Sequence, residues 1–186
     1  MVEMALMSWP LLFMLLGVSV VGFNLGRNIQ VSQICRDAGS MYVRGVDFSK
    51  DSNKDILVRL SNPMGLQKTG GNGVVYLSKI TYISQSRCTA LGLNPCNANQ
   101  HVIMQRLVIG NTSLKSSEIG TPNSNLIDSK GLVTDYYREP SAVANVPFIS
   151  LADGEFAYIA ETYFPSPDFD LVGYRVGTGN YTRSLF

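Results

Sequence analysis

Asp51, Asn53 and Asp55 carry side-chain oxygens at alternate positions, and this spacing is the arrangement in the chain that most resembles a calcium site. An EF-hand loop with this start would need glycine where Ile56 stands and glutamate where Asn62 stands. Because both are missing, we interpret the segment as a charged, solvated loop and keep calcium as the weaker alternative. We expect no other metal site, since no cysteine or histidine spacing is typical of zinc.

Residues able to carry out acid–base or nucleophilic catalysis are few and scattered. His101 is the only histidine, and no serine or cysteine stands at a spacing that would build a catalytic triad with it. Glu155 and Glu161 fall in an expected strand, where we interpret both as surface acids rather than as a paired general acid and base. No glycine-rich phosphate-binding motif occurs. We therefore expect no enzymatic activity and no cofactor.

Two further features matter only if the chain is exported. Cys88 and Cys96 flank a turn-rich loop, and a disulfide across it would stabilise the fold by about 2–3 kcal/mol. The alternative is two free, half-buried thiols. Cys35 is left over, either as a buried thiol on a helix or as an intermolecular link. Asn111 and Asn180 each begin an N-glycosylation sequon, which matters only in a lineage that glycosylates such sites.

The composition is that of one ordinary domain attached to an apolar segment. Of the 186 residues only 16% are charged, and 15 Lys and Arg against 14 Asp and Glu leave a net charge of +1. Because the basic residues are scattered, we expect no nucleic-acid partner. Seventeen glycines, nine tyrosines and eight phenylalanines indicate turns and aromatic-rich strands.

Strand signals are concentrated in the second part of the chain. Apolar runs and period-two alternation predict strands at residues 56–60, 74–84, 101–109, 154–164 and, at an edge, 171–176. The strands at 74–84 and 101–109 should form an antiparallel pair whose connection is closed by the cysteine pair. Residues 47–55, 61–73 and 110–147 are predicted to be loops or irregular structure.

The N-terminal segment is long enough to cross a membrane. Glu3 is followed by 23 residues without a charged side chain, and Arg27 ends this run. About 20 mostly apolar residues suffice for a helix to span the hydrocarbon core of a bilayer. An acid at the tip of an apolar span is costly and usually has a specific partner. The segment is therefore compatible with a membrane helix that carries one carboxylate at its start.

The helix should continue beyond the apolar run. Spacings of three and four residues predict an amphipathic continuation, whose buried face would hold Leu25, Ile29, Ser32, Cys35 or Arg36, and Gly39. Pro10 lacks an N–H group and should kink the helix or open a local gap. We expect an α+β protein: a long helical part over residues 1–44 and an antiparallel β-sheet head over residues 45–186.

The charges around the span leave the side of the membrane open. No basic residue precedes the span, whereas Arg27 and Arg36 follow it. Taken literally, the positive-inside rule keeps the head in the cytoplasm. If a short basic leader is removed from the precursor, the same rule places the head outside.

The start of the chain resembles a known family. Val2-Glu3-Met4-Ala5-Leu6, then Pro10-Leu11-Leu12 and an apolar run, then Gly26-Arg27, are similar to the N-terminus of TadE-like pilins, the tight-adherence branch of the type IV pilin superfamily. The resemblance covers residues 2–27. Mature members usually hold the glutamate five residues in, and here it is third. The resemblance implies a lollipop-shaped subunit, a basic leader removed by a prepilin peptidase, and assembly by an inner-membrane machine with an ATPase.

These observations together favour a structural subunit of an extracellular filament. Before assembly the helix would sit in the inner membrane, and afterwards copies would pack through residues 4–25, with close approach at small residues such as Gly17 and Gly22. Pro10 belongs to the same assembly segment. Glu3 would pair with the N-terminal amine of a neighbouring copy and set the axial register. The head would present the surface used for adhesion at the cell surface.

Two other classes of function remain open at this stage. One is a monomeric binding domain that stays anchored in a membrane and faces the periplasm or the cell surface. The other is a membrane-tethered enzyme, which the lack of a convincing catalytic site disfavours. Contact between neighbouring copies along the apolar helix separates a filament subunit from an anchored monomer.

Overall fold

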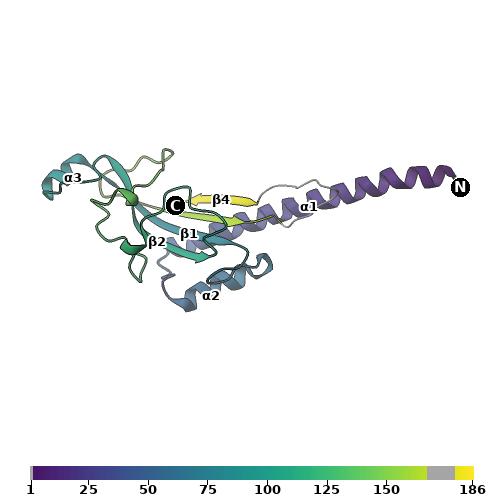
Figure 1. The fold of residues 1–186 in the computed structure, drawn as a ribbon, viewed down its shortest axis with the longest axis horizontal. Coiled ribbons are helices and arrows are strands. Elements are labelled where there is room, and N and C mark those ends of the chain that lie inside the picture. The colour runs from purple at the N-terminus through teal and green to yellow at the C-terminus, as the bar shows by residue number, and fades with distance from the viewer. Residues whose placement is uncertain (1, 167–178) are drawn as a thin grey trace.

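The computed structural model describes residues 2–166 and 179–186, with side chains from residue 8 onward. A single long helix runs beside a four-stranded sheet and projects far beyond it (Figure 1). This layout confirms the predicted α+β class and the long N-terminal helix. The elements, in chain order, are α1 (Val2–Val43), α2 (Asp51–Leu60), the short 3₁₀ helix η1 (Asn62–Met64), β1 (Val74–Ile83), α3 (Gln85–Ala90), β2 (Gln100–Gly110), η2 (Ser124–Leu126), η3 (Pro140–Ala142), β3 (Phe156–Phe164) and β4 (Asn180–Leu185).

The sheet is antiparallel throughout, in the order β2-β1-β3-β4. β1 and β2 form the predicted antiparallel pair, and α3 with the disulfide loop lies in their connection. The pairing of β1 with β2 shifts between Lys79 and Ile80, which marks a β-bulge. Because side chains alternate along each strand, every strand sends one set of residues toward α1 and the other set away from it.

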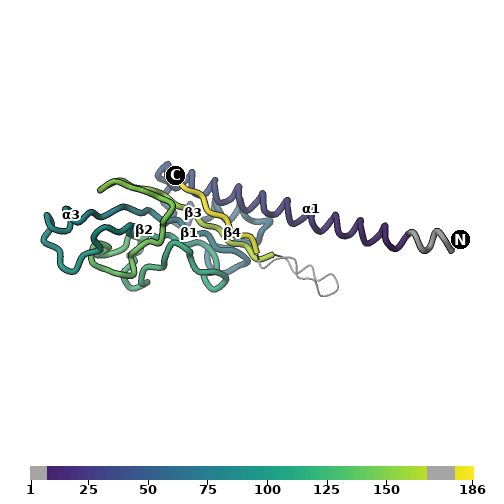
Figure 2. The backbone as a smooth tube through the Cα atoms, turned by 90° about the horizontal axis from the view of Figure 1, so that it is seen from above, coloured from purple at the N-terminus to yellow at the C-terminus, as the bar shows by residue number. Residues whose placement is uncertain are grey.

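The two faces of the sheet are covered by different parts of the chain. On one face, Leu77 and Phe164 pack against the C-terminal half of α1. On the other face, Ile80 and Ile159 pack against the long connection between β2 and β3, which contributes Ile119 among others. Figure 2 shows this arrangement, with α1 along one side of the sheet and the connection along the other. The sheet is therefore buried on both faces.

The buried face of α1 is offset from the predicted one. Leu25 and Ile29 are 61% and 53% exposed, whereas Cys35 and Gly39 are buried as expected. The residues that pack on the head follow the spacing of three and four residues from a later start: Val31, Ile34, Cys35, Ala38 and Tyr42. The prediction was wrong for the first two positions because the sheet begins to cover α1 only at about residue 31.

The predicted strand at 56–60 is wrong, and the predicted loop at 47–55 holds only for residues 47–50, because residues 51–60 form helix α2. Asp51 stands in its first turn and Arg59 in its last, which suits the helix dipole. Leu57 is fully buried while Ile56 is 46% exposed, so the short apolar run is one stripe of a helix. The predicted edge strand at 171–176 lies outside the described residues, and the two edges of the described sheet are β2 and β4.

Candidate assembly and membrane surface

The N-terminal half of α1 is an uncovered apolar surface. With the exception of the half-buried Val20, the large apolar side chains from residue 9 to residue 25 are at least 38% exposed: Trp9, Leu11, Leu12, Phe13, Met14, Leu15, Leu16, Val18, Val21, Phe23 and Leu25. A helix that is apolar on all sides is typical of a membrane span or of the core of a larger assembly. The helix is long and apolar enough to cross a bilayer, and none of its most apolar window is buried against the rest of the chain.

The small residues of this surface face open space. A Cβ atom added at Gly17 or Gly22 would meet no atom within 4 Å. Glycine costs roughly 1 kcal/mol relative to alanine inside a helix, and among the described residues no neighbouring atom requires it at these positions. Ser19 donates its hydroxyl to the carbonyl of Leu15 at 2.8 Å, so its polar group is satisfied within the helix. The surface is thus able to accept a close neighbour.

Pro10 lies within α1, which is one continuous helix from Val2 to Val43. The ring removes one backbone donor, yet the helix continues on both sides of it. Glu3 belongs to the helix by its backbone, and its side chain lies outside the described residues. The pairing expected for Glu3 therefore stays a prediction.

The C-terminal half of α1 is fixed to the head by specific contacts. The Cys35 thiol is fully buried and donates to the backbone carbonyl of Ala160 at 3.3 Å, with the carbonyl of Thr182 at 3.5 Å. Cys35 is unpaired, which agrees with the buried-thiol alternative. At Gly39 the ring of Phe186 occupies the space where a Cβ would stand. One half of α1 is therefore part of the head core, and the other half is free to contact lipid or another protein.

A buried ion pair lies on the face of the sheet away from α1. Arg106 of β2 and Glu161 of β3 are 4% and 0% exposed, and Nη1 of Arg106 lies 3.4 Å from Oε2 of Glu161. The prediction that Glu161 is a surface acid is therefore wrong, whereas Glu155 is exposed as expected. The signal available in the sequence was Arg106 itself, a charged residue among the apolar residues of strand β2.

Glu161 also binds the neighbouring loop and the edge strand. Its carboxylate accepts hydrogen bonds from the hydroxyl of Ser117, the backbone N–H of Glu118 at 3.0 Å and the hydroxyl of Tyr181 at 2.6 Å. Burial and the adjacent Glu161 carboxylate raise the pKa of Tyr181. Burial lowers the pKa of Arg106, while Glu161 opposes that effect. The arrangement joins β2, β3, β4 and the loop through one carboxylate.

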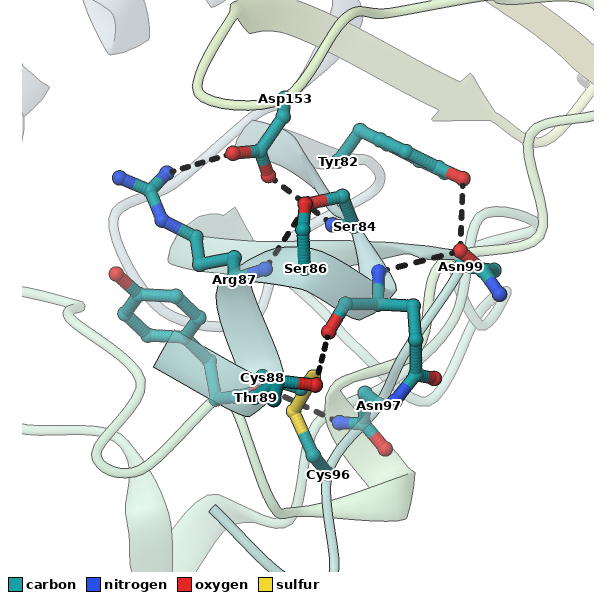
Figure 3. The surroundings of a disulfide bond; sticks show 12 residues. Tyr82, Ser84, Ser86, Arg87, Cys88, Thr89, Cys96, Asn97, Asn99 and Asp153 are labelled. Carbon is teal, nitrogen blue, oxygen red and sulfur yellow. Dashed lines mark hydrogen bonds and ion pairs between the residues drawn. A yellow bond between two sulfur atoms is a disulfide. The ribbon is translucent and has the colours of Figure 1, made fainter. Parts of the chain in front are cut away.

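The expected disulfide joins Cys88 and Cys96 at the end of the head remote from α1's N-terminus (Figures 1 and 3). Cys88 is buried on α3, whose first turn is capped by the side chain of Ser84. Arg87 reaches Asp153 at 3.7 Å, which holds α3 beside the connection that precedes β3. The crosslink therefore fixes the short helical excursion between β1 and β2.

The remaining predicted sites do not come together. Asp51 and Asp55 lie on α2 and pair with Lys54 and Lys68 at 3.4 and 2.9 Å, while Asn53 donates to a backbone carbonyl. In the described part of the chain no three His, Cys, Asp or Glu side chains are grouped as metal ligands.

The two sequons lie at one end of the sheet, and the histidine lies near the other end. Asn111 follows β2 and accepts hydrogen bonds from Ser113, and Asn180 begins β4. The His101 ring contacts the Tyr82 ring in a tilted arrangement, with ring centroids 5.3 Å apart. No protein-family model, curated protein or solved structure matches this chain.

Proposed function

We propose that this chain is a pilin-like structural subunit of an extracellular filament, as the TadE-like start of the sequence implies. The observation that carries the proposal is the division of α1. Its C-terminal half is locked into the head, while its N-terminal half exposes apolar side chains on all sides. Burying one such side chain stabilises by about 1.5–3 kcal/mol. The isolated chain leaves this surface uncovered, so it is available to a bilayer first and to other copies afterwards.

Transfer of the apolar half of α1 from the bilayer to a bundle of such helices should involve only a small change in free energy. The side chains leave lipid for other apolar helices, so the gain comes from close packing rather than from removal of water. Glycines with open space around them, Gly17 and Gly22, allow helices to approach closely. The proposal includes residence in the inner membrane before assembly, processing by a prepilin peptidase, and assembly by an ATPase-driven machine. The head would then face outward and serve adhesion.

A monomeric, membrane-anchored binding domain is the second candidate. The same apolar helix favours it, because α1 meets the length and composition of a membrane span without any contact to another copy. The two candidates differ in what surrounds residues 4–25. In a filament these residues contact other copies, whereas in an anchored monomer they contact lipid alone.

Disulfide crosslinking separates the two candidates. Val18 is 74% exposed on the apolar half, and Asp37 is exposed on the half that packs on the head. We expect Val18→Cys to give crosslinked multimers in the fraction sheared from cells, and Asp37→Cys to give few. Crosslinking confined to the membrane fraction, with no sheared material, would contradict a filament.

Glu3→Ala tests the proposed register role separately. If Glu3 pairs with the amine of a neighbouring copy, the variant should lose most sheared filaments while the head keeps its disulfide and its resistance to proteolysis. Filaments at wild-type yield would remove this role from Glu3 and leave the packing role of the apolar surface intact.

A further inference from the structure

A groove lies where α1 emerges from the head. It has a volume of about 620 Å³ and is bounded by Phe23, Asn24 and Arg27 on α1 and by Pro63 and Met64 of the segment after α2. Arg27 is the first charged residue after the uncharged run. If that run crosses a bilayer, this groove lies at the boundary between hydrocarbon and headgroups.

Two polar atoms of the groove lack partners. Nδ2 of Asn24 and Nε of Arg27 are shielded from solvent, and neither has a hydrogen-bond acceptor within the described ranges. A buried donor without an acceptor is destabilising. Both atoms are donors, one belongs to a cation, and the described lining contains no acidic side chain. A ligand that fits the groove must therefore supply acceptors and negative charge.

Apart from Gln30, the rest of the groove lining is apolar, and the groove is roomy. Phe23 is 68% exposed, and Met64 closes the opposite wall. Gly26 lines the groove without a side chain, and a Cβ added there would meet no atom within 4 Å. The apolar wall continues directly into the exposed surface of α1 through Phe23. The ligand should thus combine an anionic head with an apolar tail.

We propose that the groove holds a membrane glycerophospholipid, with its phosphodiester on Arg27 and Asn24 and an acyl chain along Phe23. Guanidinium binds phosphate oxygens through charge-assisted hydrogen bonds. A free phosphate would satisfy the donors but leave the apolar wall wet, so the lipid is the better source of the same chemistry. This inference rests on the membrane residence of α1, which is part of the proposed function, and does not depend on filament assembly.

Native mass spectrometry of the full chain in a non-ionic detergent tests the proposal with dioleoylphosphatidylglycerol as the probe. The wild type should retain one lipid per chain, and Arg27→Gln should weaken that binding at least about tenfold. Gly26→Leu should block it by filling the groove. Arg36→Gln is the matched control, since Arg36 is an exposed arginine on the same helix outside the groove, and it should bind as the wild type does.

Competition identifies the part of the lipid that is recognised. Dioleoylglycerol, which lacks the phosphate, and glycerol 3-phosphate, which lacks the tails, should each displace the lipid poorly. Equal binding by Arg27→Gln and Arg36→Gln would overturn the proposal, as would displacement by dioleoylglycerol. A lipid-free dimer that Arg27→Gln dissociates would instead assign the groove to a second copy.

Vesicle flotation distinguishes failure of this inference from failure of the proposed function. If the chain floats with phosphatidylglycerol vesicles but Arg27→Gln binds lipid normally in detergent, only the groove proposal is overturned. If the wild type does not float, α1 does not reside in the bilayer, and both proposals are overturned.

Discussion

Arg106 of β2 and Glu161 of β3 form a buried ion pair across the central strand β1, with 3.4 Å between Nη1 of Arg106 and Oε2 of Glu161. Removing charges from water is costly, and such a pair is tolerated only when further hydrogen bonds satisfy both groups. Glu161 accepts hydrogen bonds from Ser117, Glu118 and Tyr181. Arg106 donates to Ser117 and to the backbone carbonyl of Gly120, while its Nε has no partner among the described residues. The pair and its hydrogen bonds therefore hold the connection between β2 and β3 in one defined position on the sheet.

Glu161→Gln should be strongly destabilising, because it leaves the Arg106 guanidinium buried without a counter-charge. We expect a loss of about 3–5 kcal/mol in the free energy of unfolding, measured by urea titration of the full chain in detergent with circular dichroism. Glu118→Gln is the control, since the Glu118 side chain is 47% exposed and its pair with Lys115 should contribute less than about 1 kcal/mol. An equal loss in the free energy of unfolding for the two variants would show that the buried pair contributes no more to stability than the exposed one.

Alkaline pH should destabilise the head partly through Tyr181. Its folded-state pKa is raised by burial and by Glu161, above the usual value of about 10. The folded state therefore keeps the proton that the unfolded state loses, so the contribution is full below about pH 10 and falls as the pH rises further. Melting temperatures from pH 8 to 11 should drop less steeply for Tyr181→Phe than for the wild type. Parallel curves would refute the link.

Much of the architecture could be predicted because its signals are local. The uncharged run before Arg27 and the alternation in β1, β2 and β3 each report one element's own periodicity. Helix α2 was missed because the five residues from Ile56 to Leu60 are too short to separate a strand from one helical stripe.

The buried site was harder to predict because it depends on pairing between distant segments. Glu161 meets Arg106 only once the register of β1 with both neighbours is set. Single-strand alternation cannot say whether a polar residue faces water or a partner. In the same way, the sheet's point of contact with α1 decided that Val31 rather than Leu25 begins the buried face.

The number of cysteines that react with iodoacetamide should depend on folding and on reduction of the disulfide. With iodoacetamide and mass spectrometry, the native chain should gain no adduct, because Cys35 is fully buried and Cys88 is bonded to Cys96. Unfolding without a reductant should expose one thiol, and unfolding with a reductant should expose three. Two or more adducts on the native chain would contradict the disulfide.

Gly17→Leu should separate assembly from folding. A Cβ added at this position meets no atom of the described residues within 4 Å, so head stability in detergent should be unchanged. In a filament the added bulk should prevent close helix packing and reduce the sheared yield several-fold. Val18→Leu, which adds one methylene to a neighbouring exposed position, should assemble normally. A normal filament yield from Gly17→Leu would argue against close packing at this glycine.

Helical reconstruction of sheared material by electron cryomicroscopy tests the central claim most directly. The proposal predicts filaments whose core consists of α1 helices from neighbouring copies, in contact along residues 4–25, with the sheet of each head outside. Particles in which residues 4–25 are surrounded only by lipid or detergent, with no contact between copies, would contradict a filament subunit and favour the anchored monomer.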